Sequence, residues 1–308
     1  MSEQIKSFDA LLSTIKDNKR KPVRTAVVGI SDGDSLAAIV RAKKEGLISP
    51  LILGSKDKIE QYCIEAGIES SSISVLNCEN KDDEAAMAAG LAGDRQVELL
   101  FCANIENSKF LGRLFDKSVG FRNGKRLISH VAVFEHEKYP RLLLMSDGVI
   151  NVAPDINKKL KIIQNAVGLA NMFGVAKPKV AMLAAVEVIY PGMPVTVEGA
   201  VISKMVDKGQ IKNCLIDGPL SWDVATMPDV AREKGATSEV AGQADIVIAP
   251  NIETGNAIYK AMSMFVKART AGLIVGGKIP LAVSSRCDNS DNIFYSLLLG
   301  SDAVMSKT

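Results

Sequence analysis

Two segments near the carboxyl-terminal end of the sequence carry residues suited to holding an anion. In ADIVIAPNIETGNAIYK (244–260) and IPLAVSSRCDNSDNIFYS (279–296), a strand-like apolar run leads through a polar loop into a helical pattern. Helix N-termini present unpaired N–H groups and a positive dipole end, and an arginine adds a planar charged fork for phosphate or carboxylate. We therefore predict an anionic ligand at these loops, whose polar residues are Thr254, Gly255 and Asn256 in the first and Ser284, Ser285 and Arg286 in the second.

Two carboxylates follow Arg286 and are candidates for a general base, namely Asp288 and Asp291. Their spacing also fits a helix N-cap followed by an acid in the first turn. An ordinary aspartate has a pKa of about 3.9 against about 8.5 for a thiol, a gap worth roughly 6 kcal/mol. Base catalysis, helix capping and orientation of Arg286 all stay open for these two residues.

The cysteines and histidines argue against a disulfide framework or a metal site. The five cysteines are far apart and form no CxxC pair, and the two histidines, His130 and His136, have no cysteine close by. We expect free thiols in a reducing compartment and no bound metal. Cys287 follows Arg286, but no histidine lies near it in sequence to act as a base.

Composition and charge narrow the class of protein. The 308 residues are 47% hydrophobic and 23% charged, with a formal net charge of +2. These values are typical of a globular protein, and the small net charge argues against nucleic-acid binding. The apolar runs are too short to span a bilayer, and residues 1–21 read as an amphipathic helix without the apolar core of a signal peptide. We predict a cytoplasmic protein that binds neither nucleic acid nor membrane.

Strand-like and helical patterns alternate through most of the chain, which predicts an α/β fold with largely parallel sheets. Apolar runs at 25–31, 50–55, 72–77 and 97–104 are each followed by a helical pattern. Runs at 127–135 and 141–148 are joined by a short, hairpin-like connection, and a long helix is predicted from Asp155 to about Gly174. Alternation then resumes, and no GxGxxG or GKS/GKT loop is present, so a nucleotide loop is not expected at GISDGDS (29–35).

The two anion-binding segments, in this order and spacing, resemble the phosphate acetyl/butyryltransferase family, and most closely phosphate butyryltransferase. The similarity continues through DGVINVAPDINKKLKIIQNAVGLANMFGVAKPKVAMLAAVE (147–187), KGQIKNCLIDGPLSWD (208–223) and KGATSEVAGQAD (234–245). It covers more than half of the chain and weakens before about residue 125. The resemblance implies two α/β domains of isocitrate/isopropylmalate dehydrogenase-like architecture with an inter-domain cleft. Residues 1–146 with 278–308 would form one domain and residues 147–277 the other.

The resemblance also implies the reaction, in which an acyl group passes reversibly between CoA and inorganic phosphate. Acyl-CoA, inorganic phosphate and acyl phosphate would be the small-molecule partners, with no separate cofactor. Arg286 would clamp the phosphoryl oxygens and Ser285 would hydrogen-bond the CoA sulfur or the phosphate. Asp288 matches an acid of the butyryl-like branch, whereas Asn292 stands where the acetyl branch has an aspartate.

Other residues match the family as substrate-binding candidates. Besides the TGN step and Ser284, the segment VGFRNGKRLISHVAVFE (119–135) resembles a family segment. It contributes Arg122, Ser129 and His130, although a lone histidine on an apolar strand is more often a core residue. Just upstream, NIENSKFLGRLF (104–115) lacks the Lys-Gly and threonine that the family pattern leads us to expect.

Three alternatives stay open. The enzyme could prefer acetyl groups, the chain could be a non-catalytic acyl-CoA-binding module, or it could be a two-domain dehydrogenase. The last needs a metal-binding set of aspartates and a cofactor loop that cannot be assembled from this sequence. Because the family commonly pairs through its second domain, a homodimer or higher homo-oligomer is expected.

Overall fold

A computed structural model describes residues 4–18, 20–103, 108–116 and 120–305. The chain divides into two compact units, which are described one at a time. The central unit consists of Met1–Ser7 with Ser129–Met262, and the terminal unit consists of Phe8–Ile128 with Ser263–Thr308.

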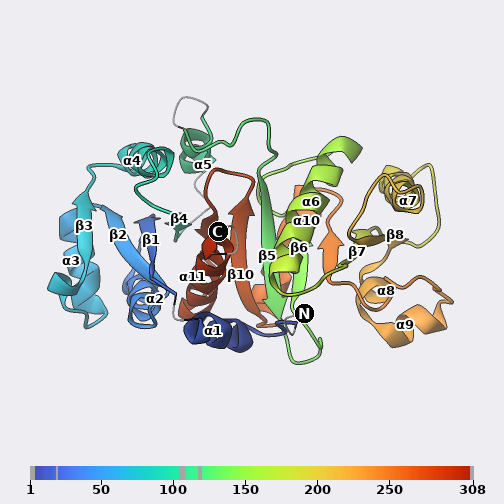
Figure 1. Ribbon diagram of the computed structural model, residues 1–308, viewed down its shortest axis with the longest axis horizontal. Coiled ribbons are helices and arrows are strands. Elements are labelled where there is room, and N and C mark those ends of the chain that lie inside the picture. The colour runs from blue at the N-terminus through green and yellow to red at the C-terminus, as the bar shows by residue number, and fades with distance from the viewer. Residues whose placement is uncertain (1–3, 19, 104–107, 117–119, 306–308) are drawn as a thin grey trace. The chain divides into compact units, whose positions relative to one another are not determined.

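The terminal unit is built on strands in the order β3-β2-β1-β4-β11-β10 (Figure 1). Neighbours are parallel except β10 and β11, which are antiparallel. The carboxyl ends of all the parallel strands therefore meet at one edge. The strands are β1 (Val23–Val28), β2 (Ile48–Gly54), β3 (Ser74–Asn77), β4 (Leu99–Cys102), β10 (Arg269–Val275) and β11 (Leu281–Val283).

Helices alternate with these strands and bury their apolar faces on them. α2 packs on α11 and α4 packs on α5, and α11 also covers β10 and β11. The helices are α1 (Phe8–Asp17), α2 (Gly33–Lys44), α3 (Lys56–Glu65), α4 (Lys81–Gly93), α5 (Ser108–Leu114) and α11 (Ser290–Met305), with a 3-10 turn η1 (Ser70–Ser72). α11 is buried along nearly its whole length, including its polar residues Asn292, Ser296, Ser301 and Asp302.

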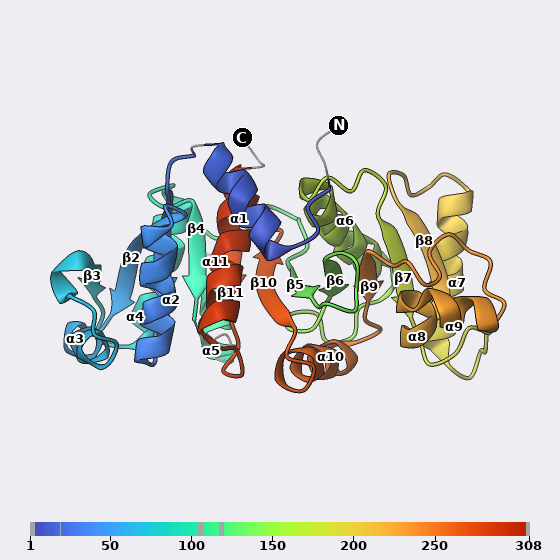
Figure 2. The ribbon, with the colours of Figure 1, turned by 90° about the horizontal axis from the view of Figure 1, so that it is seen from below.

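The central unit has strands in the order β5-β6-β9-β7-β8. All neighbours are parallel except β5 and β6, so β5 begins at the edge where the other strands end. Figure 2 shows α6 and α10 on opposite sides of β5, β6 and β9. The strands are β5 (Ser129–Glu135), β6 (Leu143–Ser146), β7 (Lys179–Leu183), β8 (Leu215–Leu220) and β9 (Ile246–Ile248). The helices are α6 (Ile156–Met172), α7 (Pro194–Asp207), α8 (Trp222–Thr226), α9 (Pro228–Glu233) and α10 (Ile252–Met264).

The predicted α/β alternation, the mostly parallel strands and the 127–148 hairpin are confirmed. The long helix is α6, whose N-cap Asp155 accepts a hydrogen bond from the Lys158 N–H, and it is followed by Gly174 at φ 79°. Of the predicted segments, residues 1–3, 19, 104–107, 117–119 and 306–308 lie outside the described residues. The compact units change over at 128/129 and 262/263, whereas the predicted domains change over at 146/147 and 277/278, so that domain assignment stays a prediction.

The structure also bears on the cysteines and on membranes. All five cysteines are free, as predicted, and burial raises the pKa of the Cys63, Cys78 and Cys214 thiols. Such thiols are poor nucleophiles.

In the part of the chain that the structure describes, no helix combines the length and apolar character that crossing a membrane requires.

Candidate active site

The segment after β11 forms a tight turn that presents Arg286. The Asp288 N–H donates to the Ser285 carbonyl at 2.9 Å, and in return the Ser285 N–H donates to Oδ2 of Asp288 at 2.7 Å. These two reciprocal bonds close residues 285–288 into a loop with Arg286 and Cys287 at its tip. Arg286 is exposed while Ser285 is buried. Because the turn is short and closed by two hydrogen bonds, it can hold the Arg286 guanidinium in a fixed orientation for binding an anion.

Ser284 fastens the start of this turn to the neighbouring strand. Its hydroxyl donates to the Ala103 carbonyl at 2.6 Å, and its N–H donates to the Cys102 carbonyl at 3.1 Å. The side chain is 1% exposed. Its hydroxyl proton is thus engaged in joining the carboxyl ends of β4 and β11, and the structure accounts for Ser284 without a ligand.

Asp288 is held from several sides. Besides binding the Ser285 N–H, its Oδ1 accepts a hydrogen bond from Ser263 Oγ at 3.1 Å and lies 3.5 Å from Thr270 Oγ1. The capping interpretation of Asp288 is wrong. Asn289 is the N-cap of α11, because its Oδ1 accepts the Asn292 N–H at 2.9 Å and its carbonyl accepts the Ile293 N–H.

Asp291 and Asn292 point to different surroundings although they are adjacent in sequence. Asp291 forms an exposed ion pair with Arg41 at 2.6 Å, and the Arg41 guanidinium lies 3.9 Å from the centre of the Phe294 ring. Asn292 is buried, and its Oδ1 accepts the Thr270 N–H at 2.9 Å. The amide at position 292 therefore ties α11 to the start of β10.

Within the terminal unit, Arg122 lies away from the Ser285–Asp288 turn. It forms a bridge with Gly277, which precedes β11, whereas the turn follows that strand. The two arginines are thus at opposite ends of β11. Close packing fixes the bridge: a Cβ on Gly277 would lie 2.6 Å from the Phe121 ring.

In the central unit, the ends of β6 and β9 and the start of β5 come together around Asp147. This carboxylate is 2% exposed and accepts four hydrogen bonds. Its Oδ1 binds the N–H groups of Val149 and Ile150 at 2.8 and 3.0 Å, and its Oδ2 binds the His130 N–H at 3.1 Å and Asn151 Nδ2 at 2.6 Å. Asp147 organises this edge, as a buried and fully bonded carboxylate can.

The TGN residues lie in the first two turns of α10 and do not cap it. The N-cap is Asn251, whose Oδ1 accepts the Thr254 N–H at 2.9 Å. A Cβ on Gly255 would lie 2.4 Å from the Asp147 carbonyl oxygen, so this glycine lets the helix touch the 147–148 backbone. Asn256 Nδ2 donates to the Gly148 carbonyl at 3.3 Å. Asn251 therefore caps the helix and Thr254 does not, and the close approach that Gly255 permits is to the protein's own backbone.

Ser129 and His130 are both buried at the start of β5. Ser129 Oγ accepts a hydrogen bond from Asn165 Nδ2 at 2.8 Å. His130 packs edge-on against Tyr259, and its Nδ1 has no hydrogen-bond partner among the described residues. Burial lowers the pKa of His130 to about 4, although the Asp147 charge acts in the opposite direction. His130 is thus a neutral imidazole at pH 7.

Several residues that organise the two regions were not predicted from the sequence. Asp147 and Asn251 follow β6 and β9, and polar residues at strand ends were a usable signal for both. Ser263 is near the end of α10, and no sequence pattern marks it. In the central unit, Glu187 accepts hydrogen bonds from the Ser221 N–H and hydroxyl. Partial burial opposes ionisation, but the bonds from Ser221 and the Lys234 charge keep the pKa of Glu187 below its ordinary value.

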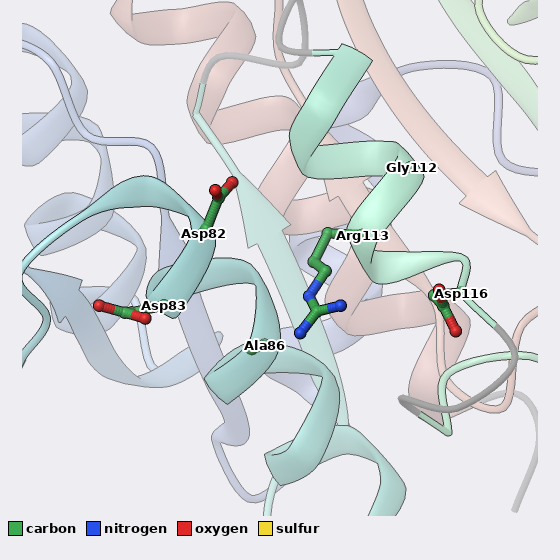
Figure 3. A pocket seen from close by; sticks show the side chains of 6 residues that line it. All are labelled: Asp82, Asp83, Ala86, Gly112, Arg113 and Asp116. Atoms are coloured by element: carbon green, nitrogen blue, oxygen red, sulfur yellow. The ribbon is translucent and has the colours of Figure 1, made fainter.

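A cavity of about 500 Å³ between α4 and α5 in the terminal unit is the wrong kind of site for a phosphate. Figure 3 shows Arg113 reaching from α5 toward α4, with Asp82 and Asp83 on α4 and Asp116 just after α5. The described lining residues thus include three acids and one arginine, and their net negative charge repels an anion. The lining residues are Asp82, Asp83, Ala86, Gly112, Arg113 and Asp116. Nowhere in the described residues do three or more histidine, cysteine, aspartate or glutamate side chains form a group that could hold a metal ion.

Comparison with known proteins gives one consistent result. The family profile described as "Phosphate acetyl/butaryl transferase" matches residues 79–300. A phosphate butyryltransferase of Clostridium acetobutylicum is 38% identical over 96% of this chain and 97% of its own length. A phosphate acetyltransferase of Thermotoga maritima is 34% identical over 91% and 94%. The crystal structure of a branched-chain phosphotransacylase from Enterococcus faecalis is 26% identical, with a TM-score of 0.79 over 92% of this chain and 99% of that one.

Proposed function

Since this chain belongs to the phosphate acetyl/butyryl transferase family and is a phosphate acyltransferase, we propose that its preferred acyl group is butyryl or a similar short chain. The reaction passes this group reversibly between CoA and inorganic phosphate. In the direction of acyl phosphate, a phosphate oxygen attacks the thioester carbonyl and the C–S bond breaks. The phosphate proton ends on the CoA thiolate, so CoA leaves as the thiol.

The observation that carries this proposal is the doubly closed Ser285–Asp288 turn with Arg286 exposed at its tip. Arg286 holds the phosphoryl oxygens and stabilises the negative charge that develops during transfer. Asp288 orients this arginine through the Ser285 N–H, since both of its oxygens already accept hydrogen bonds. Ser285 forms a hydrogen bond with the CoA sulfur or with the phosphate.

The remaining predicted residues take lesser roles. Asp291 supports α11 through its ion pair with Arg41. Thr254, Asn256 and Arg122 bind substrate, as do Ser129 and His130 if they move from their buried positions. Gly255 and Ser284 act through the backbone contacts described above.

Asn292 supports the butyryl assignment. The resemblance gives the acetyl branch an aspartate at this position, and here an amide oxygen accepts the Thr270 N–H in a buried environment. Acetyl preference is the second candidate, favoured by the similarity to the acetyltransferase of Thermotoga maritima. One methylene in an apolar pocket is worth about 1–3 kcal/mol, so we expect overlapping specificity across short chains.

The deciding experiment measures thiol release from acetyl-, propionyl-, butyryl- and branched acyl-CoA, with and without phosphate. We expect phosphate-dependent release with the highest kcat/KM for a four- or five-carbon acyl group, about 10-fold or more above acetyl-CoA. A higher kcat/KM for acetyl-CoA would overturn the butyryl preference. Tight acyl-CoA binding without turnover would instead support the non-catalytic alternative.

We further propose the domain division implied by the resemblance, residues 1–146 with 278–308 and residues 147–277, around a cleft like that of isocitrate/isopropylmalate dehydrogenases. The enzyme works as a cytoplasmic homodimer or larger homo-oligomer without a cofactor. Sedimentation that shows only monomer at assay concentration would contradict the assembly.

A further inference from the structure

We propose that Ser263 is a positioning residue that acts through Asp288 to fix the turn carrying Arg286. This role rests on the proposed function, because it concerns the orientation of the arginine that holds phosphate. Ser263 lies in the last turn of α10, far from Arg286 in sequence, and is 9% exposed.

The geometry starts from the two oxygens of Asp288. Oδ2 accepts the Ser285 N–H at 2.7 Å and so belongs to the turn itself. Oδ1 faces the other way, accepting from Ser263 Oγ at 3.1 Å with Thr270 Oγ1 at 3.5 Å. The first of these two distances lies just above the usual range for an O–H···O hydrogen bond and the second lies well above it. Ser263 is therefore the nearer of the two hydroxyl groups that restrain Oδ1.

A restraint on Oδ1 is also a restraint on Arg286. The carboxylate is planar, so rotation that carries Oδ1 away from Ser263 also carries Oδ2 away from the Ser285 N–H. That bond is one of the two that close the turn, the other being the Asp288 N–H to the Ser285 carbonyl. A displacement of about 1 Å in a positioning group can cost 100-fold in rate. Looser closure would thus lower turnover while the fold remains intact.

Replacement of Ser263 by alanine isolates this contact. Alanine has a higher helix propensity than serine, so α10 itself should not be weakened. Thr270 remains buried at the start of β10 and cannot move closer without losing its own bond from N–H to Asn292. The change therefore removes the hydrogen bond to Asp288 together with the weak contact at 3.9 Å from Cys287 Sγ to Ser263 Oγ, and both of these partners belong to the same turn.

A matched control is available in the same unit. Ser301 is a fully buried serine of α11 whose hydroxyl donates to the Leu298 carbonyl at 2.8 Å. Its hydroxyl serves α11 itself and not the Ser285–Asp288 turn. Ser301→Ala is thus the same chemical change at a site that serves only the fold.

The experiment measures kcat, the KM for phosphate, the KM for butyryl-CoA and Tm for four proteins: wild type, Ser263→Ala, Ser263→Thr and Ser301→Ala. We expect Ser263→Ala to lower kcat by about 10-fold, the size of one lost hydrogen bond to a charged group. Its KM for butyryl-CoA and its Tm should match those of Ser301→Ala. Ser263→Thr keeps the hydroxyl and should recover to within about 3-fold of wild type.

A double-mutant cycle tests that the effect passes through Asp288. In an Asp288→Ala background, Ser263→Ala should change kcat by less than about 2-fold, because residues that act as a unit are not additive. Ser263→Cys keeps the side-chain volume with a weaker donor and should fall between serine and alanine. This variant also serves if Ser263→Ala does not fold.

Four results would overturn the role. Wild-type kinetics in Ser263→Ala with a lowered Tm would make Ser263 purely structural, and an equal loss in Ser263→Thr would point to packing. If the losses in kcat of Ser263→Ala and Asp288→Ala were additive, Ser263 would not act through the Asp288 carboxylate. A wild-type enzyme without phosphate-dependent thiol release would overturn the proposed function and this role together, whereas an active wild type with an unaffected Ser263→Ala overturns this role alone.

Discussion

The two regions that share the anion-binding sequence signature use their polar residues in different ways. Around Asp147 in the central unit, hydrogen-bonding groups are buried and turned inward, and Gly255 brings a helix against the backbone. Around Asp288 in the terminal unit, buried bonds close a turn whose tip is an exposed arginine. Both lie at the carboxyl ends of parallel strands.

Similar loop chemistry thus buries a fully bonded carboxylate in one region and presents an exposed arginine in the other. A buried carboxylate with four donors is already satisfied and gains nothing from a ligand. A guanidinium carries several N–H donors, so an exposed arginine at the tip of a fixed turn can bind an anion besides the partner that it already has. Three substitutions can break or sharpen this contrast, and they are given from the largest expected effect to the smallest.

The largest effect is expected for Gly255→Ala, on stability. Its new Cβ would lie 2.4 Å from the Asp147 carbonyl oxygen, a distance that real Cβ atoms do not adopt. The helix or the 147–148 segment must shift, which should cost about 3 kcal/mol or more of unfolding free energy. Chemical denaturation measures this loss.

Gly168→Ala is the control, because a Cβ there meets nothing within 4 Å and α6 gains helix propensity. It should be neutral or stabilising by up to about 1 kcal/mol. If Gly255→Ala were as stable as wild type but had lost acyl transfer, Gly255 would be a ligand-binding residue. The two regions would then not differ in the way described.

The next effect is expected for Arg286→Gln, on activity. If the guanidinium stabilises charge during transfer, kcat and kcat/KM should fall together by about 100-fold, or roughly 2.7 kcal/mol. Arg286→Lys keeps the charge without the fork and should recover part of this loss. Steady-state kinetics with both substrates near saturation distinguishes the outcomes.

Because Arg286 is exposed, its replacement should leave the unfolding free energy within about 0.5 kcal/mol of wild type. A rise in the phosphate KM alone, with kcat unchanged, would reduce Arg286 to a ground-state binding residue. Near-normal turnover in Arg286→Gln would remove it from the site.

The smallest effect concerns His130 and acid stability. Burial holds the pKa of His130 at about 4, below the ordinary 6.5, so the unfolded chain takes up its proton first as pH falls. The stability that depends on the neutral form is complete above pH 6.5 and is lost progressively toward pH 4. Between pH 6.5 and 5 this amounts to about 2 kcal/mol.

His130→Gln should therefore lose about 2 kcal/mol less than wild type over that interval when both are denatured chemically at each pH. His136→Gln, at the partly buried histidine of the β5–β6 connection, is the matched control. Identical slopes in all three proteins would mean that His130 is not held neutral, and the description of the Asp147 region as closed would fail.

Local sequence patterns were sufficient to predict the helices and strands, but they predicted the contacts between them poorly. The strand runs and the helix after Asp155 could be read from apolar periodicity and capping chemistry, and their bounds agree within a few residues. At the start of α11 the sequence suggested Asp288 as a cap, whereas the folded chain uses Asn289, and at the start of α10 the cap is Asn251. Short polar side chains compete for the same N–H groups, and only the folded backbone selects among them.

The sequence alone determined the class of fold, the family and the two polar loops, since these depend on periodicity and on motifs that are contiguous in the chain. Tertiary structure decided which polar groups are already used. The Asp147 carbonyl against Gly255, the Ser263 hydroxyl on Asp288 and the Thr270 N–H on Asn292 each join residues distant in sequence. No local pattern encodes such contacts, because burial and hydrogen-bond partners arise only when separate strands and helices pack together.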